Sequence, residues 1–119
     1  MIRHNRNAAA GPAAAALCAL LLGPMQLGIA TSALAASASH TVVMEGVAFV
    51  PETLTVKRGD TVVWVNKDMF PHTATAQDRS FDSKDIAPTK TWKHVAAKTG
   101  TFSYLCTLHP TMKGTLIVR

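Results

Sequence analysis

The sequence has little of what would indicate a multidomain enzyme or a nucleic-acid-binding protein. It is 119 residues long, with 16% charged and 6% aromatic residues, which is enough for one small domain. Lys57 and Arg58 are its only adjacent basic pair, so it has no basic tract. Without Arg3 and Arg6, ten basic residues stand against seven acidic ones, and the net charge falls from +5 to +3. We therefore expect no nucleic-acid partner.

The first 35 residues have the composition of an export signal. Arg3 and Arg6 provide a positive start, and residues 13–22 form an apolar run. Small residues at the two positions that signal peptidase inspects predict cleavage after Ala35, or alternatively after Ala38. A signal of this kind predicts export to the periplasm and a mature domain of residues 36–119.

A retained membrane anchor is the alternative interpretation of this segment. An anchor needs about 20 unbroken apolar residues. Pro12, Gly23, Pro24 and Gly28 interrupt the stretch before that length is reached. We therefore expect no stable membrane association once the signal has been removed.

Removal of the signal would leave a single cysteine, Cys106. An exported domain of about 80 residues buries only about 60% of its unfolded surface, so such domains commonly rely on disulfides or a metal. One cysteine cannot form an internal disulfide. Cys106 is therefore either a buried thiol that packs as a small apolar side chain or a metal thiolate.

From Thr41 onward, apolar residues alternate with polar ones and turn residues separate the alternating segments, which is typical of β-strands. A short strand is expected to begin near His72. Residues 78–90 form a polar connection in which Phe81 and Ile86 point inward. The expected fold is an all-β Greek-key sandwich of seven to eight strands. Its inward-facing strand residues are Leu54, Val56, Val62, Trp64, Trp92, His94, Ala96, Phe102, Tyr104, Cys106, Leu116 and Val118.

A candidate metal site lies late in the chain, where Cys106, His109 and Met112 recur every third residue. Each step spans no more than roughly 10 Å of extended chain, so one loop can bring all three side chains to one ion. Pro110 stiffens this loop. His72 follows Pro71 at the end of another interstrand loop and is the fourth candidate ligand.

Two imidazoles, a thiolate and a thioether are the donors of a blue-copper site. Zinc is the alternative metal, but it is seldom held by a thioether. A zinc site would reduce Met112 to a packing residue and leave the fourth position open. His94 has no soft partner nearby in the sequence and is interpreted as structural, and His40 is given no role.

The order of short motifs resembles the cupredoxin family of small type 1 copper proteins, in particular its amicyanin-like and plastocyanin-like members. Thr73 stands where amicyanins commonly have Asn, and Thr89 stands where related sequences often have Gly. The matching motifs are Phe49-x-Pro51, Val56-x-x-Gly59-Asp60, Val62-x-Trp64-x-Asn66-x-Asp68, Pro71-His72-Thr73, Phe81-Asp82-Ser83, Gly100-x-Phe102-x-Tyr104-x-Cys106 and His109-Pro110-x-Met112-x-Gly114.

The resemblance implies one copper ion held by His72, Cys106, His109 and Met112, and a role as a one-electron carrier. A periplasmic copper carrier or storage protein would use the same ligands. A copper enzyme would need further ligands, and His-x-His pairs are absent, so we expect no enzymatic activity.

His109 is the expected electron port. The residues expected to surround the site are Met69, Phe70, Pro71, Thr73, Leu108 and Pro110. The expected partners are redox proteins, a dehydrogenase or a c-type cytochrome, bound weakly and transiently by a monomer.

Overall fold

The computed structural model describes residue 11, residues 23–31 and residues 35–119. The chain divides into two units, Met1–Ser32 and Ala33–Arg119. In the first unit, Met25, Leu27 and Ile29 are exposed. Most of the export signal predicted for residues 1–35 lies outside the described residues, and cleavage after Ala35 or Ala38 stays a prediction. Among the described residues, no helix is both long and apolar enough to cross a membrane.

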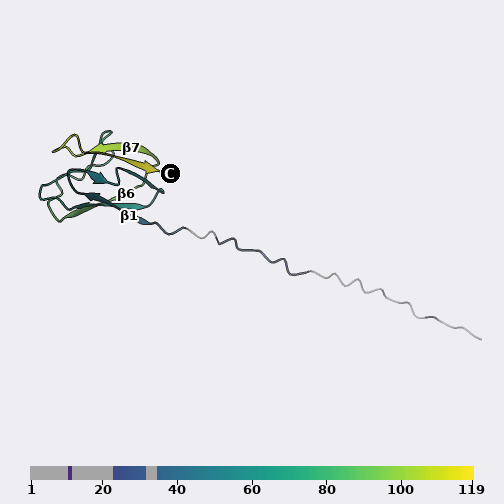
Figure 1. Ribbon diagram of the computed structural model, residues 1–119. Helices are drawn as coiled ribbons and strands as arrows, with labels where there is room; N and C mark the ends of the chain where they lie inside the picture. The colour runs from purple at the N-terminus through teal and green to yellow at the C-terminus, as the bar shows by residue number, and fades with distance from the viewer. Residues whose placement is uncertain (1–10, 12–22, 32–34) are drawn as a thin grey trace, which may run out of the picture. The chain divides into compact units, whose positions relative to one another are not determined.

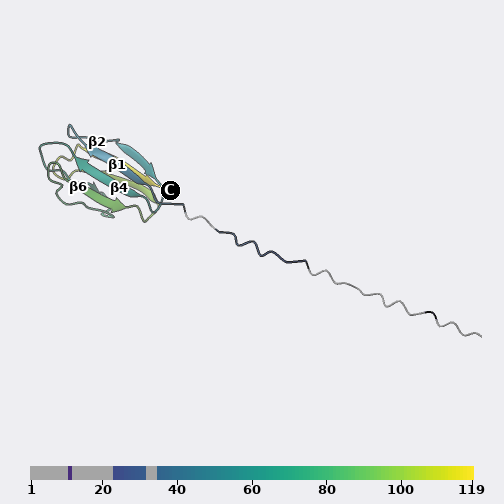
Figure 2. The same cartoon turned by 90° about the horizontal axis from the view of Figure 1, so that it is seen from below.

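Residues 35–119 form eight strands in two four-stranded sheets (Figure 1), which confirms the predicted all-β sandwich. The first sheet has the order β2 (Phe49–Val50), β1 (Ser39–Met44), β4 (Thr61–Asn66) and β6 (Thr91–Val95). Figure 2 shows these four strands side by side. The second sheet has the order β3 (Thr53–Val56), β8 (Lys113–Val118), β7 (Gly100–Leu105) and β5 (Thr75–Ala76).

The pairing is mixed, because β1 is parallel to β4 and β3 is parallel to β8, whereas the remaining pairs are antiparallel. Parallel neighbours need crossover connections, which here pass from one sheet to the other. The Arg58 N–H donates to the Arg119 carbonyl, so the chain enters β4 near the end of β8. Strands β4 and β7 thus both finish at the end of the sandwich where β8 starts. The chain segments that follow β4 and β7 carry the predicted ligands.

Alternating burial along the strands builds the core between the sheets, as the sequence predicts. Trp64 is fully buried, and its ring centroid lies 5.6 Å from that of Tyr104 and 5.4 Å from that of Trp92. Phe81 and Ile86 are buried although they belong to the irregular connection. The contact between Trp64 on β4 and Tyr104 on β7 joins the two sheets, whereas Trp92 lies on β6 of the same sheet as Trp64. Cys106 comes directly after β7.

The short strand expected to begin near His72 begins later in the chain. Regular pairing begins only at Thr75, and His72 forms an isolated bridge with Ile86. Between these points the Ser83 hydroxyl accepts the Ala74 N–H at 2.7 Å, so a side chain replaces a ladder bond. The segment 81–86 is thus paired with the segment 72–76 and fixes the backbone of His72.

Candidate metal centre

The segment from Cys106 to Met112 is a closed loop. The Cys106 N–H donates to the Met112 carbonyl at 3.0 Å, and the Met112 N–H donates to the His109 carbonyl at 2.8 Å. The His109 N–H donates in turn to the Cys106 carbonyl at 3.3 Å. Pro110 suits such a turn because it fixes its own φ and has no N–H to satisfy. The loop therefore holds its own shape between β7 and β8.

His72, Cys106 and His109 come together although 34 residues separate the first two. One possible donor atom from each lies within 4.8 Å of the others. Cys106 Sγ lies 3.7 Å from Nδ1 of His72 and 3.8 Å from Nδ1 of His109. A sulfur and a nitrogen that share one ion at ordinary bond lengths are separated by roughly 3.5–3.8 Å. The three side chains therefore fit a common metal ion without rearrangement.

The chemistry of the donor atoms limits which metal ion the site suits. Cys106 and His72 are fully buried, and His109 is partly exposed. A buried thiolate with two imidazoles suits a type 1 copper site. Met112 is also buried, and its carbonyl group accepts the Cys106 amide, so its main chain lies at the site. Its role as the fourth ligand stays a prediction.

Asp68 is part of the site, and the sequence analysis did not assign it a role. Its Oδ2 lies 2.7 Å from Nε2 of His72. An ionised carboxylate only accepts hydrogen bonds, so Nε2 carries the proton and Nδ1 is left as the donor atom that faces Cys106. The sequence signal was the four-residue spacing of Asp68 and His72, which becomes informative only when the loop between them is known.

The carboxylate of Asp68 is itself held by a turn between β1 and β2. The N–H of Gly46 donates to Oδ1 at 2.7 Å, and the N–H of Val47 donates to Oδ2 at 2.9 Å. Both residues have positive φ, 63° and 54°, which points successive N–H groups at one anion. Burial raises the pKa of Asp68, but the hydrogen bonds from Val47 and His72 outweigh it, and the net pKa is lowered.

Asn66 braces the same loop from inside. Its buried side-chain amide donates to the carbonyl groups of Phe70 and Ile86 at 2.7 and 2.9 Å. Its Oδ1 accepts the N–H of Asp68 at 2.9 Å. Every polar atom of this buried side chain is thus used to hold the loop that ends at His72.

Thr73 joins the two ligand-bearing segments. Its N–H donates to Cys106 Sγ at 3.3 Å. Its Oγ1 accepts the N–H of Thr107 at 2.9 Å. Thr73, which stands where amicyanins commonly have Asn, therefore provides both a bond to sulfur and a bond between the loops.

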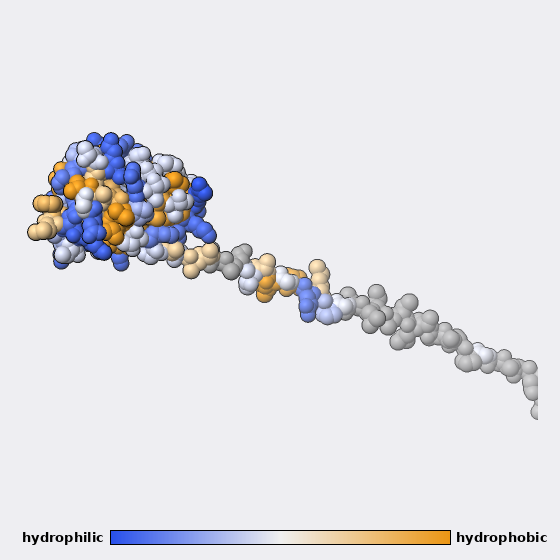
Figure 3. All heavy atoms as spheres, in the orientation of Figure 1, coloured by the Kyte–Doolittle hydropathy of each residue, from blue (hydrophilic) through white to orange (hydrophobic). Residues whose placement is uncertain are grey.

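The apolar residues around the site lie at the surface. Met69 is 87% exposed, Phe70 is 56% exposed and Leu108 is 46% exposed, and Pro71 and Pro110 are exposed as well. The Phe70 ring lies 6.3 Å from the His109 ring. On the face shown in Figure 3, hydrophobic residues gather in groups among hydrophilic ones. Phe70 thus lies beside the partly exposed His109, whereas Cys106 is fully buried.

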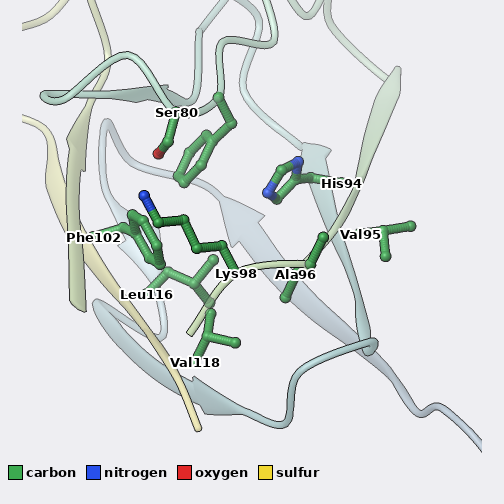
Figure 4. A pocket seen from close by; sticks show the side chains of 10 residues that line it. Ser80, His94, Val95, Ala96, Lys98, Phe102, Leu116 and Val118 are labelled. Carbon is green, nitrogen blue, oxygen red and sulfur yellow. The ribbon is translucent and has the colours of Figure 1, made fainter. Parts of the chain in front are cut away.

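The other two histidines of the domain lie elsewhere. His40, which the sequence analysis gave no role, contacts Asp60 with 2.9 Å between Nε2 and Oδ2. His94 stacks on Trp92 with an interplanar angle of 14°, and burial lowers its pKa. Figure 4 shows its ring at an apolar cavity of about 140 Å³ lined by Phe102 and Leu116, among others. His94 belongs to no metal-binding group in the described part of the chain.

Comparisons with known proteins agree with this geometry. A model of the cupredoxin-like domain matches residues 13–118. Amicyanin from Paracoccus versutus is 28% identical over 80 residues, which cover 63% of this chain and 61% of that protein. The match thus spans less than two thirds of that relative. Plastocyanin from Scenedesmus fuscus is 33% identical over 84 residues, which cover 60% of this chain and 86% of that protein.

Solved structures show the same fold. The Cu(I) form of an amicyanin mutant has a TM-score of 0.64 and 26% identity, covering 68% of this chain and 82% of that one. A copper-containing nitrite reductase from Thermus scotoductus also has a TM-score of 0.64, with 30% identity, but this chain covers only 22% of its length.

Proposed function

This chain belongs to the cupredoxin-like domain family, and on that premise we propose that it is an exported one-electron carrier with a single copper ion. The observation that carries the proposal is the buried thiol of Cys106, which lies within 3.8 Å of an imidazole nitrogen on either side. Copper bound there would supply the one-electron Cu(II)/Cu(I) couple. Met112 completes the proposed ligand set with His72, Cys106 and His109.

The residues around these donors keep them in place. Asp68 orients the His72 ring, and Thr73 donates an N–H to the thiolate. A donor set that is held from outside changes little when the charge of the site changes, which lowers the rearrangement needed for each electron. Rigid support of this kind suits electron transfer better than rapid release of the ion.

His109 is the proposed electron port, because it is the partly exposed imidazole of the group. The Phe70 ring lies 6.3 Å from it, and the apolar side chains of Met69 and Leu108 are exposed as well. A small apolar patch suits the weak and brief contacts of redox partners. The excess of basic residues in residues 36–119 favours acidic partner surfaces and faster association at low salt.

The proposed partners are a dehydrogenase, a c-type cytochrome or both, met in the periplasm by a monomer. The amicyanin and plastocyanin that the chain resembles are small cupredoxins. The nitrite reductase is much longer than this chain, which covers 22% of it. We therefore propose that the chain is not itself an enzyme.

Visible and paramagnetic resonance spectra of the copper-loaded exported protein test the proposal. An intense thiolate-to-Cu(II) band and a reversible one-electron wave are expected. Cys106→Ser should abolish the band, and an intense blue band that survives this change would refute the site. Rapid loss of copper to a mild chelator, without a reversible wave, would indicate copper carriage instead.

A further inference from the structure

Three threonine hydroxyls connect the metal centre to the polar connection 78–90. We name Thr107, Thr73 and Thr75 the threonine chain. Thr73 Oγ1 accepts the N–H of Thr107 at 2.9 Å and lies 3.2 Å from Thr107 Oγ1. Thr75 Oγ1 lies 3.0 Å from Thr73 Oγ1 and 3.1 Å from Oδ1 of Asp82. The threonine chain thus links Thr107, the residue after Cys106, to the carboxylate of Asp82 in the connection 78–90.

Asp82 is the acceptor at the outer end of the threonine chain, and its carboxylate is held in place by Lys84. Its Oδ1 accepts the N–H of Lys84 at 2.9 Å, and its Oδ2 lies 3.0 Å from the Lys84 ammonium. Its backbone forms a bridge with Thr75, which brings the two side chains together. Hydrogen bonds from the Lys84 N–H and ammonium lower the pKa of Asp82, so the group is an ionised acceptor at neutral pH. The hydroxyl of Thr75 can therefore donate to it.

Thr73, in the middle of the threonine chain, has little conformational freedom. Thr73 is buried, and its Oγ1 is within hydrogen-bond distance of three atoms, on Thr75 and Thr107. A buried hydroxyl that several partners share keeps one rotamer, because every other rotamer leaves a polar atom unsatisfied. Loss of the Thr75 hydroxyl or of Asp82 therefore gives Thr73 Oγ1, which accepts the Thr107 N–H, more freedom to move.

We propose that Asp82 is a positioning residue of the metal centre. It holds Thr75, and Thr75 holds the hydroxyl of Thr73. That hydroxyl accepts the N–H of Thr107 and so holds the residue after Cys106 against the segment that carries His72. The inference deepens the proposed function and rests on it, since the connection 78–90 then sets how firmly the two ligand-bearing segments are joined.

Hydrogen exchange of the Thr107 amide in the metal-free chain tests this directly. Thr75→Val removes the hydroxyl at constant shape, and exchange at Thr107 should become roughly fivefold faster, the factor expected for loss of one hydrogen bond. Asp82→Ala should accelerate it in the same direction. Thr75→Ser keeps the hydroxyl and should restore the original rate.

Asp78→Ala is the matched control. Asp78 lies on the same connection and carries the same charge, but its carboxylate accepts the N–H of Ser80 at 2.9 Å and not a threonine hydroxyl. This variant should leave the Thr107 amide unchanged. If Thr75→Val and Asp82→Ala exchange at the rate of Asp78→Ala, the inference is overturned.

The copper-loaded variants give a second readout. Thr75→Val and Asp82→Ala should shift the position or relative intensity of the thiolate-to-Cu(II) bands, whereas Asp78→Ala should not. Absence of such bands in the unaltered protein would refute the proposed function and leave the amide result standing. If the unaltered protein shows these bands but the variants leave the exchange rate of the Thr107 amide unchanged, only the proposed role of Asp82 is refuted.

Discussion

The carboxylate of Asp68 and the imidazole of His72 lie 2.7 Å apart, from Oδ2 to Nε2. The same carboxylate accepts the N–H groups of Gly46 and Val47, which belong to the turn between β1 and β2. The orientation of one metal donor therefore depends on a turn more than twenty residues earlier. This arrangement leads to the first prediction.

Asp68→Ala should weaken copper binding by roughly 10- to 100-fold, the usual cost of removing the carboxylate that orients a ligand histidine. The change leaves Nε2 of His72 without its acceptor and frees the ring to turn. Competition with a chelator measures the affinity. Asp85→Ala removes the same charge from an exposed position and should bind copper as the unaltered protein does. Equal affinities for the two variants would contradict the role of Asp68.

Met112→Leu should leave copper bound and make the reduction potential more positive by about 59 mV or more, a tenfold change for one electron. Removal of a weak axial donor destabilises Cu(II) more than Cu(I). Voltammetry of the loaded protein measures the shift. A potential identical to that of the unaltered protein would show that Met112, although buried, only packs against the site.

Asp60→Asn should flatten the acid dependence of stability. Asp60 accepts the N–H groups of Ala38 and Lys57 and contacts His40. The Ala38 bond, followed by His40 and the Lys57 bond, lowers the pKa of Asp60 to about 2. A group with a lowered folded pKa stabilises the fold above its unfolded pKa and loses that contribution as pH falls.

The window for Asp60 runs from about pH 4, near its ordinary value of 3.8, down to about pH 2. Urea unfolding of the metal-free protein at several pH values measures the dependence. The unaltered protein should lose more stability across this window than Asp60→Asn, whose stability at neutral pH should be lower. Parallel curves would exclude Asp60 as an acid-sensitive anchor of β1.

Thr89→Gly should stabilise the fold by about 0.5–1 kcal/mol. Thr89 has a φ of 69°, which is unfavourable for a β-branched residue. It follows Pro88 in a turn closed by the Lys90 N–H and the Ala87 carbonyl at 3.0 Å, and this position favours glycine. Thermal unfolding measures the change. Thr91→Gly, in extended strand β6, should destabilise instead, so a loss in both variants would contradict the strain at Thr89.

The sequence was sufficient to predict the sandwich and the convergence of three donors. Strand periodicity predicted the burial of residues such as Trp64 and Tyr104, because inward and outward positions alternate along a strand. The spacing of Cys106 and His109 predicted a chelating loop, because that spacing is local. His72 was predicted to join them because it follows Pro71 at the end of another interstrand loop, and the resemblance to a known family implied the same ligand.

The contacts that support the donors were not predictable in the same way. Asp68 acts through the N–H groups of Gly46 and Val47, which only the fold brings near it. His40 on β1 meets Asp60, which directly precedes the parallel neighbour β4, and neither residue has a distinctive local pattern. The short strand expected to begin near His72 begins only at Thr75, because Ser83 supplies a side-chain bond where a ladder bond was expected.

The backbone bonds that close residues 106–112 begin and end within that segment. The segment between β7 and β8 can therefore be replaced as a unit, because its main-chain bonds do not involve the two strands. Lengthening or shortening it by a residue would alter how the sulfur and imidazole donors are spaced while the scaffold stays as it is. The chemical properties of a bound metal could thus be changed through this loop without a new fold.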